Sequence, residues 1–363
     1  MKKRQHLEQS ESPNYNPQDS TRDRAKKVLS LVFGILFLVF GVGCLYVDNM
    51  LSKINFVPNE SESFGLSSTA VSAPVSVPES AASSEPISEP GIVGGLYHDD
   101  AITNVLLLGV DDYQANDPGR SDTMMLVSVD TRHQKLKLTS FMRDLYVAIP
   151  GHSSNKLNTA YHFAGGGASG AAQTVLTIEA NFGVDIDRFV IISNSAFDKI
   201  VDQLGGVSVT ITAEEAKLIN RYSGDSRRNL TAGTFNLSGK QAHYYARIRA
   251  IGDDFERTER QRKVFVSLAN KFKTQNIGTI YNALSNTLGL VTTNMTKNEI
   301  LGMAANSLTY LNYPISQCRI PADGEYYSDN LTVGNVLVPD MPACQKRVAE
   351  FIFEDDLPGK KAE

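Results

Sequence analysis

Hydrophobic residues form three different patterns along this chain of 363 residues. The first is an uncharged run, Val28–Val47, which as a helix of about 20 residues would be roughly 30 Å long, the thickness of the hydrocarbon core of a bilayer. Lys26 and Lys27 precede this run and Asp48 follows it. By the positive-inside rule, the pattern predicts a single transmembrane helix, with a cytoplasmic N-terminus and all later residues outside the cell.

A cleaved signal peptide is the alternative interpretation of this run. The apolar region of a signal peptide is usually about 7–15 residues long, and small residues at a cleavage site follow it. The run here is longer, and Tyr46-Val47-Asp48 lacks such a site. A permanent anchor in the cell membrane is therefore favoured.

The second pattern is a polar stretch that follows the apolar run. Residues 58–91 are rich in Ser, Pro, Ala and Glu, contain no Lys or Arg, and include a single aromatic residue, Phe64. Such a segment cannot bury enough apolar surface to offset the entropy lost on ordering. We predict a flexible linker over residues 48–95, which would let the domain that follows work beside the membrane.

The third pattern begins near Ile102, where short apolar runs alternate with amphipathic segments. The predicted strands are Asn104–Val110, Thr123–Asp130, Leu136–Phe141, Arg188–Ser193, Gly206–Ile211 and Gln317–Ile320, the second and third being joined by a hairpin turn. The predicted helices are 160–182, interrupted by the glycines at 165–167, then 196–204, 239–246, 258–273, 275–288, 297–311 and 341–354. This alternation predicts an α/β fold, a layered α-β-α domain with a central mixed sheet.

These patterns divide the chain into six parts. They are a basic cytoplasmic tail (1–27), the transmembrane helix (28–47), the linker (48–95), the main domain (96–275), its continuation or an appended subdomain (276–355), and a tail (356–363). The net charge is −5 overall, with +3 on residues 1–27 and −5 on residues 48–91, which leaves −3 on residues 92–363. A domain of that sign is a poor binder of nucleic acid, which requires neutralisation of phosphates.

Several familiar catalytic and cofactor motifs do not explain the main domain. The sequence contains no CxxC, HExxH or GxSxG motif, and its six histidines have no metal-ligand spacing. Gly165-x-Gly167-x-x-Gly170 has the spacing of a dinucleotide fingerprint but does not directly follow a predicted strand. A break in a helix is the favoured interpretation of these glycines.

Arginines and aspartates instead follow the ends of the predicted strands. Ligands of α/β sheets usually bind at such strand ends. Guanidinium groups bind phosphate oxygens in pairs, and carboxylates hold Mg²⁺, so this combination suits a pyrophosphate. The alternative is that each arginine makes an ordinary surface ion pair. This could explain a single arginine, but it explains less well why the whole set follows the ends of apolar elements. The residues concerned are Asp111, Arg120, Asp122, Arg143, Lys156, Arg247, Arg249, Arg257, Arg260 and Gln261.

The order of the motifs over residues 100–275 resembles the LytR-CpsA-Psr family. The matching segments are Gly109-Val-Asp111, Arg120-Ser-Asp122-Thr-Met, Ser140-Phe-Met-Arg143-Asp144, Lys156-Leu-Asn158-x-Ala-Tyr161, Phe197-x-x-Ile-Val-Asp202-x-Leu-Gly-Gly-Val207, Leu237-Ser-Gly-Lys-Gln-Ala242-x-x-Tyr-Ala-Arg247-x-Arg249 and Asp254-Phe-x-Arg257-x-x-Arg260-Gln261. One departure is Asp187-Arg188-Phe189, where members often have Asp-His-Tyr, and no catalytic position is affected.

The resemblance implies an extracytoplasmic glycopolymer–peptidoglycan phosphotransferase. Members transfer a glycan phosphate from an undecaprenyl-pyrophosphate carrier to the C6 hydroxyl of N-acetylmuramic acid, which attaches a teichoic acid or capsule to the wall. The expected partners are therefore a polyprenyl-pyrophosphate-linked glycopolymer, peptidoglycan and the membrane.

Roles for individual residues follow from the resemblance and from their chemistry. The expected catalytic residues are Asp111, Asp122, Arg143 and Arg257, with Mg²⁺ as cofactor on Asp111 and Asp122. One aspartate near the metal would deprotonate the acceptor hydroxyl, and the sequence leaves open which one. The expected pyrophosphate ligands are Arg120, Arg143, Lys156, Arg247, Arg249, Arg257 and Gln261.

Two other functions remain open at this stage. A polyprenyl-pyrophosphate hydrolase would use the same residues with water as the acceptor. A non-enzymatic membrane-bound regulator of the envelope is the other, although a cytoplasmic tail of residues 1–27 shows no helix-turn-helix pattern.

Two structural expectations complete the sequence analysis. A polyprenyl chain must leave water, so we expect a deep apolar pocket lined by the helices near 160–182 and 196–204, with the arginines at its mouth. Cys318 and Cys344 both lie on the expected outer side, where a disulfide can form, and we expect a bond between them.

Overall fold

The computed structural model describes residues 52–57, 96–111, 117–226, 229–274 and 288–354. The chain divides into two units, Met1–Ser52 and Lys53–Glu363, and the second contains the strands and helices of the described residues. The predicted transmembrane helix, most of the predicted linker and the predicted helix over 275–288, apart from its last residue, lie outside the described residues. Among the helices of the described part, none is both long and apolar enough to cross a membrane.

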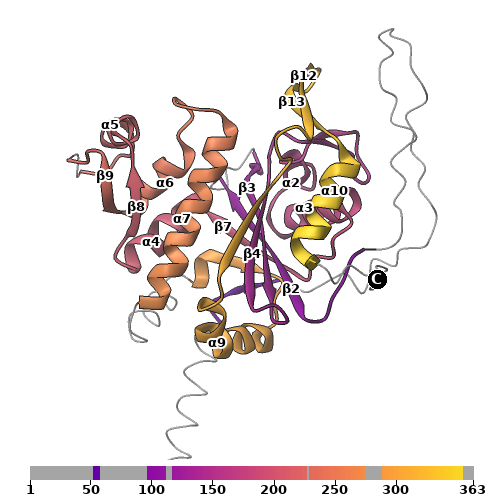
Figure 1. Cartoon of the computed structure of the whole chain (residues 1–363), viewed down its shortest axis with the longest axis horizontal. Coiled ribbons are helices and arrows are strands. Elements are labelled where there is room, and N and C mark those ends of the chain that lie inside the picture. Colours follow the sequence, from indigo (N-terminus) through magenta and orange to yellow (C-terminus); the bar gives the residue numbers. More distant parts are fainter. Residues whose placement is uncertain (1–51, 58–95, 112–116, 227–228, 275–287, 355–363) are drawn as a thin grey trace, which may run out of the picture. The chain divides into compact units, whose positions relative to one another are not determined.

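A seven-stranded mixed sheet forms the centre of the domain (Figure 1). Its order is β1 (Asn55–Phe56), β10 (Val291–Thr293), β7 (Arg188–Ser193), β2 (Ile102–Val110), β3 (Ser121–Asp130), β4 (Lys135–Phe141) and β11 (Ile315–Ile320). The pairs β1–β10, β7–β2 and β4–β11 are parallel, and the other three pairs are antiparallel. The predicted mixed sheet is confirmed, and Asn55–Phe56 belong to it although we assigned them to the linker.

Helices cover both faces of this sheet (Figure 1). One group consists of α2 (Thr159–Phe163), α3 (Gly167–Phe182) and α10 (Met341–Phe353), and the other of α4 (Asn194–Gln203), α6 (Gly239–Arg247), α7 (Asp254–Thr274) and α9 (Lys297–Leu311). The apolar runs of β2 and β3 supply much of the main core, in which Leu106 and Leu126 are fully buried, and β4 contributes Phe141. Strands buried on both faces are apolar at nearly every position, which is why their pattern was easy to recognise.

A second, smaller core lies around a two-stranded sheet. It packs β8 (Val207–Ile211) and β9 (Gly233–Leu237) with α5 (Ala213–Tyr222), α6 and α7. The predicted strand at 206–211 is therefore present, but it belongs to this small sheet and not to the central one.

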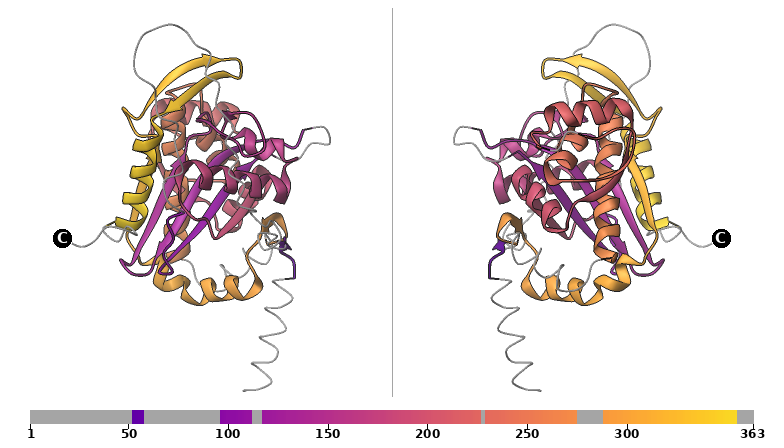
Figure 2. Two further views of the ribbon diagram at one scale, coloured as in Figure 1. Left: turned by 90° about the vertical axis from the view of Figure 1, so that its right-hand side faces the viewer. Right: turned by 90° about the vertical axis from the view of Figure 1, so that its left-hand side faces the viewer.

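The segment after residue 287 extends the main domain. Its strands β10 and β11 pair with β7 and β4, and α10 packs on α3. It also contains the 3₁₀ turn Leu288–Leu290 and the hairpin of β12 (Tyr326–Leu331) and β13 (Gly334–Pro339), which projects at the opposite end of the domain from α9 (Figure 2). Of the two possibilities left open by the sequence, continuation of the domain is the one observed.

The glycines between α2 and α3 form a helix break, as predicted. Gly165, Gly166 and Gly167 all have positive φ. A Cβ atom on Gly166 would lie 2.7 Å from the carbonyl oxygen of Pro118, so only glycine fits where the break approaches the loop before β3. The dinucleotide interpretation is excluded, because the break joins two helices rather than a strand and a helix.

Candidate functional site

A cavity of about 550 Å³ lies where β2, β4 and β7 end and β3 begins. The carboxyl ends of these parallel strands meet at one edge of the sheet, because β3 reverses the chain between β2 and β4. Six predicted site residues line the cavity together with four others: Asp111, Asp117, Gly119, Arg120, Asp122, Arg143, Asn158, Asn194, Arg247 and Arg249. The predicted gathering of arginines and aspartates at the strand ends is present in the structure.

Asp111 follows β2 and is held from two other elements. Its Oδ1 accepts hydrogen bonds from Asn194 Nδ2 at 2.8 Å and from Arg247 Nη1 at 3.0 Å. Asn194 begins α4, directly after β7, and Arg247 ends α6. The Asp111 side chain is still 44% exposed, so it remains available to a ligand in the cavity.

Asp122 lies among three guanidinium groups. Arg143 Nη1 donates to Oδ1 at 3.2 Å and Arg249 Nη2 to Oδ2 at 3.3 Å, while Arg247 Nη2 lies 3.9 Å from Oδ2. Burial raises the pKa of the Asp122 carboxyl, but Arg143 and then Arg257 and Arg249 outweigh this effect, so its pKa lies below the usual range. Asp122 is therefore a stable carboxylate that holds the arginines in place.

Arg143 connects the cavity to a second acidic group. Its Nε lies 3.2 Å from Asp144 Oδ2 and 3.5 Å from Asp254 Oδ1. Burial lowers the pKa of Arg143, but Asp254, Asp144 and Asp122 together raise it above the usual value. The guanidinium is thus a permanent cation at the wall of the cavity.

Arg257 does not line the cavity, although we predicted that it binds pyrophosphate. Its side chain is only 2% exposed, and Nη2 donates to Asp254 Oδ2 at 3.1 Å. Burial lowers its pKa to about 10, partly opposed by Asp254. The first turn of α7 turns this residue inward, where it contributes positive charge beneath Asp122 and Arg143 without contacting the cavity.

Lys156 and Gln261 also lie outside the lining of the cavity. Lys156 Nζ donates to Asp144 Oδ1 at 2.9 Å, so its charge is paired with the acid beside Arg143. Arg260, which was also among the candidate phosphate-binding residues, is buried and binds Glu215 and the carbonyl groups of Ile248 and Ile251. It holds the loop that carries Arg249 and is not a ligand of the cavity.

Asn158, Asn194 and Asp117 line the cavity but were not among the predicted site residues. Both asparagines could have been predicted from the sequence. Asn158 belongs to the motif Lys156-Leu-Asn158-x-Ala-Tyr161, and Asn194 directly follows a predicted strand, as Asp111 does. Asn158 is 5% exposed, and its Oδ1 has no hydrogen-bond partner among the described residues.

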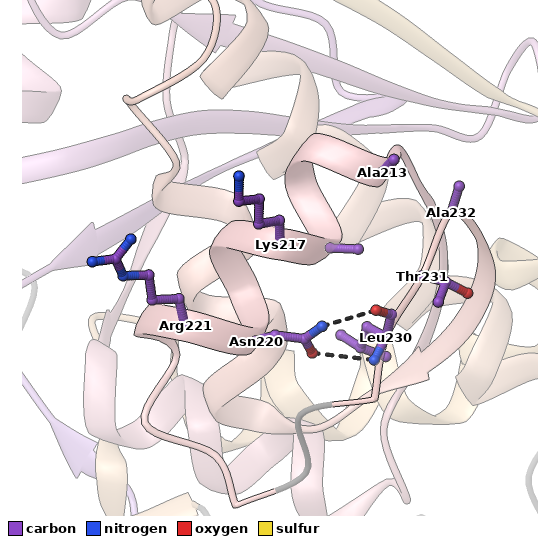
Figure 3. Close-up of a pocket in the computed structure, with 8 residues that line it drawn as sticks. Ala213, Lys217, Asn220, Arg221, Leu230, Thr231 and Ala232 are labelled. Atoms are coloured by element: carbon purple, nitrogen blue, oxygen red, sulfur yellow. Dashed lines mark hydrogen bonds between the residues drawn. The ribbon is translucent and has the colours of Figure 1, made fainter.

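The predicted apolar pocket is not found at this site. The lining of the cavity is polar or charged apart from Gly119, and the predicted helices 160–182 and 196–204 contribute none of it. A different cavity of about 510 Å³ lies between α5 and residues 230–232, with Lys217 and Arg221 beside it and Asn220 bonded to the backbone of Leu230 (Figure 3). It contains none of the predicted site residues.

The predicted disulfide is also absent. Cys318 and Cys344 are both free thiols. Cys344 is fully buried in the main core at the start of α10, and Cys318 packs against the same core from β11. The expectation of a disulfide was wrong, because both thiols are packed against the core and unpaired.

The chain is similar to a family of known proteins. The sequence pattern of the LytR_cpsA_psr family matches residues 68–350. A polyisoprenyl-teichoic acid–peptidoglycan teichoic acid transferase TagU of Oceanobacillus iheyensis is 35% identical over 49% of this chain and 54% of its own length. TagT of Bacillus subtilis is 32% identical over 51% and 58%, and a TagU of Bacillus cereus is 31% identical over 63% and 71%. This chain therefore spans little more than half the length of the first two relatives.

Solved structures show the same fold. A structure of TagT bound to LI-WTA matches 71% of this chain and 91% of its own, with a TM-score of 0.57 and 26% identity. A structure of YwtF (TagT) with bound octaprenyl pyrophosphate lipid matches 70% and 91%, with a TM-score of 0.53 and 23% identity.

Proposed function

Because this chain belongs to the LytR_cpsA_psr family, we propose that it transfers a glycan phosphate from a polyprenyl-pyrophosphate carrier to peptidoglycan. In finer detail, the carrier is undecaprenyl pyrophosphate and the acceptor is the C6 hydroxyl of N-acetylmuramic acid. One observation carries the proposal: Arg120, Arg143, Arg247 and Arg249 line a single cavity with Asp111 and Asp122. Relatives named as teichoic acid transferases, and the related TagT structure with a polyprenyl pyrophosphate, support it.

The arginines would bind the pyrophosphate oxygens. In the described structure Arg143, Arg247 and Arg249 are held by Asp111 and Asp122, which fixes their side chains before any substrate arrives. Bidentate guanidinium–phosphate pairs are strong and directional, and they stabilise the charge that develops on the phosphoryl group during transfer. Asp117 and Asn194 add polar groups at the wall, suited to sugar hydroxyls.

Asp111 and Asp122 also fit a magnesium ion. Asp111 Oδ1 lies 3.0 Å from Arg247 Nη1 and Asp122 Oδ2 lies 3.9 Å from Arg247 Nη2, and the residue Asn158 lines the same cavity. Oxygen ligands from one or two carboxylates, completed by phosphates and water, are those that Mg²⁺ prefers. When bound, Mg²⁺ would neutralise the phosphate charge and make the lipid phosphate a better leaving group.

Asp111 is the better candidate for the general base. The lowered pKa of Asp122 makes that carboxylate a weak proton acceptor. Asp111 has two hydrogen-bond donors on one oxygen, and its side chain is 44% exposed toward the cavity. It is therefore placed to receive the proton of the acceptor hydroxyl.

The proposed location follows from the sequence. Val28–Val47 would anchor the chain in the cell membrane as a single pass, with residues 1–27 in the cytoplasm and the domain outside. The lipid-linked substrate lies in the same membrane, so the anchor would keep the enzyme near it.

A transfer assay tests this proposal. The full-length protein in detergent would be incubated with labelled polyprenyl-pyrophosphate glycan, Mg²⁺ and peptidoglycan, and wall-linked label would be measured. We expect transfer by the wild type and a loss of about 10²–10³-fold in Arg143→Ala, because one charge-stabilising donor is worth about that much. Arg221→Ala is the matched control, since Arg221 is exposed on α5 and lies against Tyr222.

The same assay separates the alternative functions. Release of free phosphorylated glycan without a wall-linked product would indicate a hydrolase. Undiminished attachment of wall polymer in cells that carry only Asp122→Ala and Arg143→Ala would indicate a non-enzymatic regulator.

A further inference from the structure

His243 lies outside the lining of the cavity but contacts one of the arginines that form it. It precedes Arg247 by one turn of α6, and its Nε2 lies 3.4 Å from Arg247 Nη1. Its Nδ1 lies 2.9 Å from Asp198 Oδ1 on α4. The edge-on ring of Phe197, at 6.1 Å between centroids, packs against the imidazole. Three residues from two helices thus surround this histidine.

These contacts fix the protonation pattern of the ring. An ionised carboxylate only accepts hydrogen bonds and a guanidinium only donates them. The Nδ1 atom facing Asp198 therefore carries the hydrogen, and Nε2 presents its lone pair to Arg247. The spacing of the histidines does not predict a metal ligand at His243, and in the structure this residue contacts Asp198 and Arg247.

The guanidinium of Arg247 would be held more steadily by a side chain that takes no part in the proposed reaction. Its other contacts are Asp111 at 3.0 Å and Asp122 at 3.9 Å. In the proposed function Asp111 and Asp122 would hold magnesium and Asp111 would receive a proton, so neither carboxylate would be reserved for Arg247. His243 is the remaining side-chain contact of Arg247 among the described residues, and as a neutral acceptor it does not compete with phosphate for the cation.

We propose that His243, oriented by Asp198, is a positioning residue that keeps the guanidinium of Arg247 directed at the substrate pyrophosphate. This inference rests on the proposed function. Holding a long side chain in its binding conformation before the ligand arrives removes part of the ordering cost of binding.

Binding of farnesyl pyrophosphate to the full-length protein in detergent, measured by calorimetry, is the first test. We expect His243→Leu to weaken binding about 3- to 10-fold, the size of the ordering cost of one side chain. His243→Gln keeps an acceptor at a similar reach and should bind within about 2-fold of wild type. His152→Leu is the matched control, because His152 is exposed and stacks on Phe163 away from the cavity lining.

Asp198→Leu probes the orientation of the ring. This variant removes the acceptor that holds the hydrogen on Nδ1, so the ring can turn or carry its hydrogen on Nε2, where it faces the donors of Arg247. This variant should bind as weakly as His243→Leu, and the double variant should be no weaker than either single one. Full additivity, no rescue by Gln, or unchanged binding in His243→Leu would each overturn the proposal.

A second readout needs no ligand. Rotation of the Arg247 guanidinium in ¹⁵N-arginine-labelled protein, followed by NMR, should be slower in the wild type and His243→Gln than in His243→Leu. Equal rotation rates would overturn the proposal. If the wild type does not bind farnesyl pyrophosphate, the proposed function fails, while this measurement still decides whether His243 holds Arg247.

Discussion

At the scale of single residues, Glu179 shows how burial without a strong partner changes a carboxyl group. Burial raises its pKa from 4.5 to about 7, and Asp185 and Asp187 add to the rise, while the amide of Ile186 opposes it. The folded chain therefore binds a proton here more tightly than the unfolded chain between about pH 4.5 and 7. The stability gained from this proton is fully present below about pH 4.5 and is lost as the pH rises through 7.

Glu179→Gln should remove this dependence. We expect the variant and the wild type to be equally stable near pH 4, and the variant to be more stable near pH 8 by roughly 3 kcal/mol, at 1.36 kcal/mol per pKa unit. Urea unfolding followed by tyrosine fluorescence measures this, since the chain has no Trp. Glu214→Gln, at an exposed position on α5, is the control. A difference that does not change between pH 4 and 8 would contradict the expectation.

The two cysteines provide a second test at this scale. Burial raises the pKa of the Cys344 thiol to about 12, and the side chain is fully buried. Because the thiolate is the reactive form, iodoacetamide at pH 8 should leave Cys344 unmodified in the folded protein and modify it after unfolding. Peptide mass spectrometry gives the result for Cys344 and Cys318 separately. A disulfide-linked peptide from a non-reduced digest would contradict the structure.

At the scale of elements, a buried ion pair connects the β3–β4 hairpin to α10. Lys137 on β4 is 1% exposed, and its Nζ donates to Asp130 Oδ2 at 2.7 Å and to the carbonyl oxygen of Ile352. Asp130 at the end of β3 is fully buried. Burying such a pair is costly, but removing only one partner is costlier still, because the buried Asp130 carboxylate then loses its lysine and keeps only the hydrogen bonds from the backbone and Nδ1 of His133.

Lys137→Met should therefore destabilise the fold by about 3–5 kcal/mol. Lys135→Met is the matched control, because Lys135 is on the same strand and binds Glu354 at 2.9 Å with 36% of its side chain exposed, so its loss should cost under about 1 kcal/mol. Urea unfolding measures both. The double variant Asp130→Asn/Lys137→Met should recover part of the loss, and no recovery would show that the unpaired charge is not the cause.

Among the secondary-structure elements, those with long apolar runs were predicted best from the sequence. The apolar runs of β2, β3 and β7 stand out because their residues are buried or half-buried on both faces of the sheet. The short amphipathic helix α5 and strand β9 were not predicted, since they cover only the small second core and carry many polar residues. The pairing of β8 with β9 is set by tertiary contacts, and no local pattern at 206–211 distinguishes that sheet from the central one.

At the scale of the whole molecule, most residues of the site could be predicted from their positions next to strand ends, because these strand ends meet at one edge of the sheet. Asp111, Asp122 and Arg247 are far apart in sequence, yet the sheet register and the end of α6 place them around one cavity. Arg257 and Gln261 could not be placed in the same way. Their position depends on how α7 is rotated against the sheet, and its first turn directs Arg257 inward.

The predicted linker supplies a final test at this scale. A flexible coil spans about 5–6 Å times the square root of its length, so residues 66–90 would contribute roughly 25–30 Å of reach. If the anchor and the domain work together at a membrane, deleting residues 66–90 should lower transfer from a lipid-linked substrate in vesicles and leave transfer in detergent unchanged. A Gly/Ser segment of equal length is the matched control and should restore transfer in vesicles, since only reach matters. Loss of transfer with that control as well would show that the linker acts through its own sequence.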